Sequence, residues 1–221
     1  MTKTDPATAK QVTADWARVF DGFDIWRPFR LLRRVGPLVQ GITLDRSTSG
    51  DAYFPTAHIH ALMRPFPVVS LALGQRLAST SGVQEAIKFT DHAEDYLDAA
   101  RRLAGQARLS LDVPPTVADV VNELRAFATA QQGLGGLPAI WAVEDSILVP
   151  SASGDRDLAE EGLQLARDLV KKWPKHRLPL DWVGEEVWIT SLRKSADNAE
   201  DLRAIVESQV RAHKLAKIRQ N

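Results

Sequence analysis

The chain has 221 residues, of which 44% are hydrophobic and 25% are charged, as is usual for a globular protein with a core of its own. It contains no cysteine, and this excludes thiol catalysis, thiolate metal sites and disulfide bonds. The 28 basic and 28 acidic residues cancel, and the pI of about 7.0 disfavours a nucleic-acid-binding module.

The charges are unevenly distributed along the chain. Residues 1–80 hold 10 Lys and Arg against 6 Asp and Glu, residues 81–170 hold 7 against 15, and residues 171–221 hold 11 against 7. The net charges of these segments are therefore +4, −8 and +4. An acidic centre between basic ends is typical either of charge complementarity within the molecule or of an acidic surface that faces a partner.

The first residues, MTKTDPATAKQVTADW, lack the apolar core that a signal peptide requires. No apolar run of about 18 residues, long enough to span a membrane, occurs in the chain. We therefore expect a cytoplasmic protein that does not enter a membrane. Arginine outnumbers lysine by 19 to 9, a bias associated with GC-rich bacterial genomes.

A helix is predicted for about residues 6–20. Asp5 is placed to cap it, Pro6 suits its first turn, and Trp16 and Phe20 recur at helical spacing. From Leu31 the pattern changes to strand. Two extended runs flank the turn-rich segment RSTSGD, and the short apolar run VVSLAL is consistent with a third strand.

From residue 81 onward the pattern is helical. A long helix fits residues 83–108, with Ser81 and Gln84 at the spacing of a capping box. A second helix is predicted after Pro115, and Thr116 and Asp119 are placed to cap it.

Two further helices are predicted towards the C-terminus. One covers residues 157–173, and the last begins near Asp197, with Asp197 and Glu200 as its cap pair. Between the helices, residues 137–150 fit two short strands or a strand and a loop, and the pattern does not decide between these two alternatives.

The predicted fold class is α+β. It consists of an N-terminal helix, a small antiparallel sheet over about residues 31–73 and a predominantly helical C-terminal two-thirds. We expect a single domain over residues 1–221. A soft subdivision near residue 80 would separate a helix and sheet in residues 1–80 from the mainly helical residues 81–221.

His58 and His60 alternate on one predicted strand, so both imidazoles project from one face, about 7 Å apart at the backbone. Two histidines in this arrangement are a way to begin a metal site. The residues with the chemistry of a third ligand are His92, Asp91 and Glu94. The alternative is a polar, partly exposed strand face that Thr56 shares with the two histidines.

Four carboxylates, those of Asp91, Glu94, Asp95 and Asp98, share one side of the long predicted helix. Paired carboxylates bind divalent cations or act as acid and base. The helical wheel places these four opposite the apolar side, where a solvated face belongs. Binding of a basic partner is therefore favoured over catalysis.

Several arginines are interleaved with Phe23, Trp26 and Phe29, a mixture that binds phosphates and stacks bases. They are Arg27, Arg30, Arg33 and Arg34. Arg33 and Arg34 point to opposite faces of an extended backbone, which argues against a single patch and makes nucleic acid an unfavoured partner.

No phosphate-binding loop, dinucleotide fingerprint, nucleophile elbow or zinc-protease pair occurs in the chain. We therefore expect a non-catalytic, bacterial, intracellular protein-interaction module, of the immunity-protein, antitoxin or adaptor kind. Its expected partner is another protein, no cofactor is expected, and homo-oligomers are compatible with the sequence. The first alternative is an enzyme with a dispersed site around His58 and His60 that uses a divalent metal. The second is a nucleic-acid-binding protein.

Overall fold

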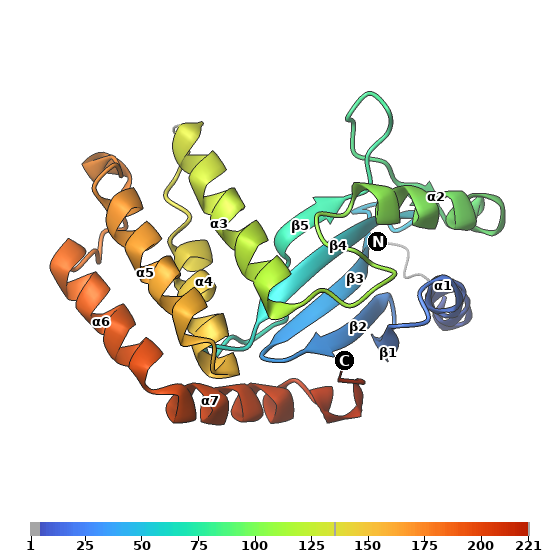
Figure 1. Cartoon of the computed structure of the whole chain (residues 1–221). Helices are drawn as coiled ribbons and strands as arrows, with labels where there is room; N and C mark the ends of the chain where they lie inside the picture. Colours follow the sequence, from blue (N-terminus) through green and yellow to red (C-terminus); the bar gives the residue numbers. More distant parts are fainter. Residues whose placement is uncertain (1–4, 135, 221) are drawn as a thin grey trace. The chain divides into compact units, whose positions relative to one another are not determined.

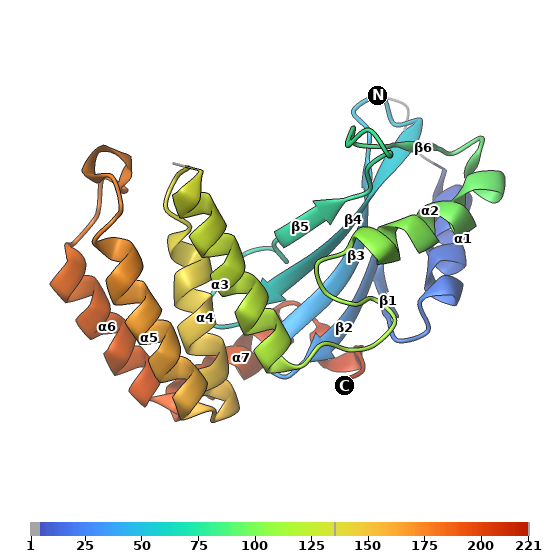
Figure 2. The ribbon, with the colours of Figure 1, turned by 45° about the horizontal axis from the view of Figure 1, so that its top comes forward.

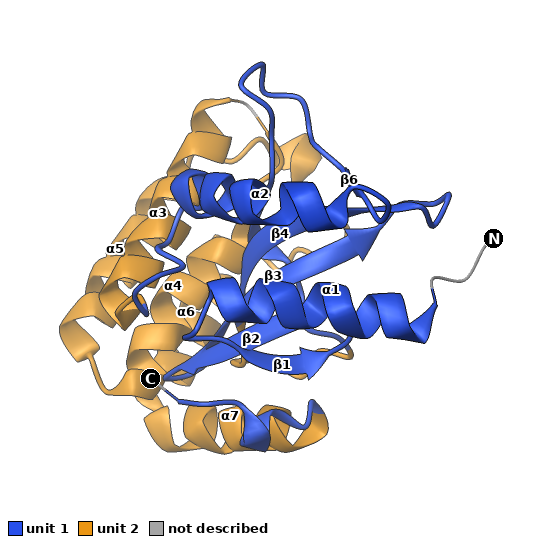
Figure 3. Cartoon of the chain, turned by 90° about the vertical axis from the view of Figure 1, so that its right-hand side faces the viewer, with its two compact units in different colours: residues 1–60, 68–114, 213–221 blue, residues 61–67, 115–212 orange. Residues whose placement is uncertain are grey.

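The computed structural model describes residues 5–134 and 136–220. The chain divides into two compact units, coloured separately in Figure 3. The sheet unit comprises residues 1–60, 68–114 and 213–221, and the helical unit comprises residues 61–67 and 115–212. The fold class is α+β, as the sequence predicts, with an N-terminal helix, a small antiparallel sheet and a mainly helical C-terminal part. The single domain expected for the chain stays a prediction.

The sheet unit is built on six strands, five of which follow one another in chain order across the sheet (Figures 1 and 2). The strands are β1 (Asp24–Arg27), β2 (Arg30–Val35), β3 (Leu38–Arg46), β4 (Ala52–Ala61), β5 (Ala72–Arg76) and β6 (Ile87–Lys88). The short β6 pairs with the first residues of β4, and β5 pairs with later residues of β4. Because most of β4 is buried, its side chains pack on both faces of the sheet.

Two helices, α1 (Pro6–Val19) and α2 (His92–Gln106), pack against the same face of the sheet (Figure 1). Trp16 of α1 and Leu103 of α2 enter one buried hydrophobic cluster with Tyr53 of β4. This cluster is the core of the sheet unit, and it orients the polar groups of α1 and α2 that are described below.

The C-terminal segment, residues 213–220, pairs at Arg34 with the end of β2 that β1 does not cover. The backbone carbonyl of Arg219 accepts a hydrogen bond from the backbone N–H of Arg34 at 3.0 Å. The guanidinium of Arg219 forms an ion pair with Asp24 at 3.0 Å. The segment includes a short 3-10 helix, η2 (Leu215–Lys217). Its buried side chains include Leu215 and Ile218.

The helical unit is organised around one central helix. Its helices are α3 (Val117–Gly133), α4 (Ile140–Ser153), α5 (Arg156–Val170), α6 (Glu185–Asp197), α7 (Ala199–Ala212) and the 3-10 helix η1 (Lys175–Arg177). Of these, α4 packs against α3, α5, α6 and α7 and is buried around most of its circumference. Among the helices of residues 5–134 and 136–220, none combines the length and the hydropathy that a membrane span requires.

Arg64 contributes an ion-pair cluster to the helical unit. Its guanidinium binds the carboxylates of Glu144 and Asp145 in α4, the second at 2.7 Å. Glu144 also accepts a hydrogen bond from the indole N–H of Trp188 in α6 at 3.0 Å. Burial raises the pKa of Asp145 to about 6, although the charge of Arg64 acts in the opposite direction. The cluster therefore ties residues 61–67 and α6 to the central helix.

Replacing Arg64 with methionine is expected to lower the free energy of unfolding by about 2 kcal/mol near neutral pH, because Asp145 loses the cation that compensates its burial. The loss should shrink at about pH 5, where Asp145 takes up a proton. Urea denaturation at both pH values measures it. The control is Arg211→Met, which removes an exposed pair with Glu207 and should cost less than about 0.5 kcal/mol. A penalty of equal size at both pH values would contradict this account.

Two predicted helices are confirmed together with their caps. The carboxylate of Asp5 accepts a hydrogen bond from the backbone N–H of Thr8 at the start of α1. Thr116 and Asp119 form the expected capping box at the start of α3. The helix predicted for residues 157–173 is also present, as α5.

The long helix predicted for residues 83–108 is wrong in its first third, because α2 begins at His92. Ile87 is buried in the core and pairs with Tyr53 as part of β6. The N–H of Ser79 donates to the carbonyl of Val83, so this segment turns instead of starting a helix. Burial of one apolar side chain outweighs the local helical pattern here.

Both alternatives for residues 137–150 are wrong, since most of this segment belongs to α4. A helix that is apolar on every side has the same sequence pattern as a buried strand. The third strand lies at residues 72–76 and not at 68–73, and both β1 and α6 have no counterpart in the prediction. The last helix begins at Ala199, where Asn198, and not Asp197, accepts the N–H of Asp201.

Candidate functional site

His58 and His60 project from the same face of β4, as predicted, but the expectation that this face is partly exposed is wrong. Thr56 and both histidines are buried. Nε2 of His58 lies 3.0 Å from the hydroxyl of Thr43. Nδ1 of His60 accepts the backbone N–H of Ser70 at 3.1 Å and lies 2.9 Å from its hydroxyl. Because Nδ1 is an acceptor, the proton of a neutral His60 resides on Nε2.

The imidazole of His58 occupies the space in front of Gly41 on β3. A Cβ placed on Gly41 would lie 2.3 Å from Nε2 of His58 and 2.7 Å from Cδ2 of Leu32. Burial, followed by the charges of Arg30 and His60, lowers the pKa of His58 to about 3. The ring is therefore neutral at physiological pH, and its Nε2 edge lies against both Gly41 and the hydroxyl of Thr43.

The residues proposed as a third metal ligand do not join the two histidines. Asp91, which precedes α2, and Glu94, in its first turn, are both exposed. His92 is hydrogen-bonded to Asp15. The imidazole of His213 does approach His60, with the rings perpendicular and their centroids 5.8 Å apart. Within residues 5–134 and 136–220, no three His, Asp or Glu side chains are grouped as metal ligands. A divalent metal at His58 and His60 stays a prediction.

A buried hydrogen-bond series that the sequence did not reveal joins α1, β4 and α2. The indole N–H of Trp16 donates to the hydroxyl of Tyr53 at 3.1 Å, and that hydroxyl lies 2.8 Å from Nδ1 of His92. Nε2 of His92 lies 3.1 Å from the carboxylate of Asp15. If the proton of His92 is on Nε2, it donates to Asp15, and Nδ1 accepts a hydrogen bond from the hydroxyl of Tyr53. Each polar group of the series then has a hydrogen-bond partner.

The order of groups in this series, acid, imidazole and hydroxyl, resembles that of a hydrolase triad. However, Tyr53 is fully buried, and burial raises its pKa above the usual value. Burial also acts to raise the pKa of Asp15, but hydrogen bonds from Gln11 and His92 and the charge of Arg18 hold it below its ordinary value. The series joins α1, β4 and α2, and its hydroxyl is closed to solvent.

The four arginines proposed for phosphate binding do not form one patch. Arg33 is completely buried, and its guanidinium donates to Gln40 at 2.8 Å and to the carbonyls of Ser110 and Val113 at 2.8 and 2.9 Å. Burial lowers its pKa to about 10. Arg33 thus holds residues 110–113 to the sheet and is not available to a nucleic acid.

The carboxylates proposed as an acidic face are exposed, as predicted. The set is Asp91, Glu94, Asp95 and Asp98. Asp98 pairs with Arg102 at 2.7 Å, and Arg102 also binds Glu85, so the charge of Asp98 is compensated. Leu97 lies among these carboxylates and is half exposed. The acidic face is available to a partner, and its role in binding stays a prediction.

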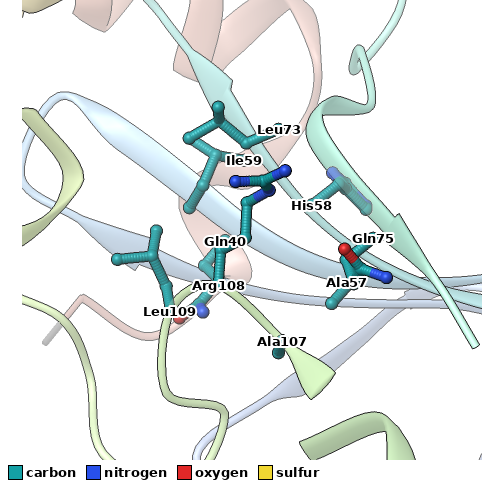
Figure 4. Close-up of a pocket in the computed structure, with 9 residues that line it drawn as sticks. All are labelled: Gln40, Ala57, His58, Ile59, Leu73, Gln75, Ala107, Arg108 and Leu109. Atoms are coloured by element: carbon teal, nitrogen blue, oxygen red, sulfur yellow. The ribbon is translucent and has the colours of Figure 1, made fainter. Parts of the chain in front are cut away.

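Depressions occur in both units among the described residues. One, of about 10 Å³, lies in the sheet unit and is lined by residues that include Gln40, Ile59 and Arg108 (Figure 4). Its volume is below the range of roughly 300–1,000 Å³ typical of ligand pockets, and the amide of Gln40 is already bonded to Arg33 and Ser110. The other, an open groove of about 730 Å³ in the helical unit, is lined by both Arg156 and Glu160. Neither depression indicates one class of ligand.

The end of α3 and the segment that leads from α5 to α6 lie at the same end of the helical unit (Figures 1 and 2). Large apolar side chains are exposed in both segments. We call this set the apolar end: Leu134, Leu137, Leu180, Val183 and Val187. Leu180 is fully exposed, at 110%, and Leu134 is 82% exposed. The side-chain amide of Gln132 donates to the carbonyl of Lys172 at 3.0 Å, which ties the two parts of the apolar end together.

The segment that carries Leu180 and Val183 is held by three tryptophans. The rings of Trp173, Trp182 and Trp188 contact one another, with centroids 5.2–5.7 Å apart. Trp173 and Trp188 are buried, so Trp182 fixes the segment to the helical core. The exposed leucine and valine therefore sit on an anchored support. Leu180 and Val183 are more than 40 residues away from Leu134 and Leu137 in the sequence. The sequence pattern therefore does not reveal the apolar end.

The chain was also compared with proteins of known family, function and structure. No family model, no curated protein and no solved structure matches it.

Proposed function

We propose that this chain is a non-catalytic protein-interaction module that acts in the bacterial cytoplasm, of the immunity-protein, antitoxin or adaptor kind. The observation that carries the proposal is the apolar end. Monomeric proteins rarely leave several large apolar side chains exposed together, and such groups mark surfaces that bind other proteins. The anchoring by Trp182 supports the proposal, because a preorganised surface loses little conformational entropy on binding.

The proposal is tested by affinity capture from a lysate of the source cells, with the full chain as bait. The wild type is expected to retain a stoichiometric partner, and Leu180→Ser combined with Val183→Ser is expected to reduce its recovery by about tenfold or more. The matched control is Val83→Ser combined with Val113→Ser, which removes two exposed valines of the sheet unit. Equal recovery by all three proteins, or no stoichiometric partner at all, would count against the proposal.

The acidic face of α2 is the second surface that we propose for a partner, in this case a basic one. The supporting observation is that its four carboxylates are exposed around Leu97, a half-exposed apolar residue. A bait with lysine at positions 91, 94, 95 and 98 tests it in the same capture experiment. Full recovery of the partner by this bait would remove the acidic face from the proposal.

A further inference from the structure

Three lysines border the apolar end with no counter-charge. Lys171, Lys172 and Lys175 are exposed in the segment that follows α5. In the part of the chain that the structure describes, no carboxylate lies within ion-pair distance of these three side chains. Their charges are therefore exposed and are not compensated by an ion pair within the described residues, in the segment that leads to the exposed Leu180.

Acidic residues follow on the other side of Leu180. Asp181 and Glu186 are exposed, and Glu185 is partly exposed, in the residues that lead into α6. The apolar end therefore has basic residues before it along the chain and acidic residues after it. A uniformly anionic membrane surface would be attracted by the first group and repelled by the second. A discrete peptide segment with a matching arrangement of charges suits both groups.

We propose that the apolar end binds an amphipathic helical segment of another protein, with acidic residues that face Lys171, Lys172 and Lys175. The apolar residues of that segment contact Leu134, Leu137, Leu180 and Val183, with anchors at the i, i+3, i+4 and i+7 spacing of one helix face. This inference rests on the proposed function and adds the chemistry of the partner. The three lysines require acidic residues in the partner segment, and the exposed leucines require apolar residues in it.

The test uses two labelled synthetic peptides and the full chain. Both are amphipathic helices with leucine on one face. The other face carries glutamate in its first half and glutamine in its second half in one peptide, and lysine in its first half and glutamine in its second half in the other. In fluorescence anisotropy, the glutamate peptide is expected to bind about tenfold or more tightly than the lysine peptide. Glutamate at positions 171, 172 and 175 should abolish that preference, and the L180S/V183S variant should weaken binding of the glutamate peptide by about tenfold.

The V83S/V113S variant should bind the glutamate peptide as the wild type does, and far-UV circular dichroism checks that every variant is folded. Equal affinity for the two peptides, or preference for the lysine peptide, would overturn the inference. Binding to phosphatidylserine vesicles that depends on Leu180 and Val183 would also overturn it in favour of a membrane. If the capture experiment retains a partner through Leu180 and Val183 while the peptides show no preference, the proposed function stands and only the acidic partner is rejected.

Discussion

Replacing Gly41 with alanine is expected to lower the free energy of unfolding by about 3 kcal/mol. The new Cβ would lie 2.3 Å from Nε2 and 2.4 Å from Cε1 of the buried His58, and 2.7 Å from Cδ2 of Leu32. Overpacking of a well-filled core typically costs about 1–3 kcal/mol. The cost at this position should be at the upper end of that range, because both the imidazole of His58 and the side chain of Leu32 must move. Urea denaturation at neutral pH measures the loss.

A double-mutant cycle identifies His58 as the cause. In the His58→Ala background two of the three close contacts are gone, so the cost of Gly41→Ala should fall by about 1 kcal/mol or more. If Gly41→Ala alone does not fold, recovery of folding in the double variant gives the same answer. The matched control is Gly105→Ala in α2, where nothing lies within 4 Å of an added Cβ and a slight stabilisation is expected. Additive costs of Gly41→Ala and His58→Ala would show that the clash is not with the imidazole.

Lowering the pH from about 7 to about 4.5 is expected to cost the protein about 2–3 kcal/mol of stability through His58. In the folded state its pKa is lowered to about 3, against 6.5 for the ordinary residue. Between these two values the unfolded chain binds a proton that the folded chain does not, so the free energy of unfolding falls as the pH falls. The imidazole Cε1–H signal of His58 should not titrate over this range in an NMR experiment.

The variant His58→Gln separates this effect from the other ionisable groups. Glutamine keeps a polar group near Thr43 and has no proton to gain, so the difference between its denaturation curves at the two pH values should be smaller by about 2–3 kcal/mol. The control, His176→Gln, changes an exposed residue and should retain the wild-type dependence. Asp145, whose pKa is raised to about 6, acts in the opposite sense, since its contribution to stability grows as the pH falls from 6 to its ordinary value. An unchanged dependence in His58→Gln would mean that the imidazole is protonated in the folded protein.

The sequence predicts best those elements whose signals are local. The caps of α1 and α3 lie within four residues of the groups they bond, so Asp5 and Thr116 could be identified directly. The start of α2 could not, because Ile87 is drawn into the core by contact with residues far away in the sequence. The apolar pattern of α4 was ambiguous because the helix is buried on most sides.

The candidate sites follow the same division. That His58 and His60 share a face follows from strand geometry alone, but their bonds to Thr43 and Ser70 depend on β3 and on the segment after β4. The series that includes Asp15 and His92 spans 77 residues and has no sequence signature. The apolar end also combines two separate segments, and each of its residues seen singly is an ordinary exposed leucine or valine.

The order of the two units along the chain has a consequence for synthesis. The sheet unit receives its last residues, 213–220, only after the whole of residues 115–212 has been made. Until then the edge of β2 lacks the hydrogen bond between Arg34 and Arg219, and Leu215 and Ile218 are missing from the interior. A chain still on the ribosome therefore exposes an open strand edge, which is a template for pairing with other chains. Residues 213–220 then pair with this end of β2 and complete the sheet unit.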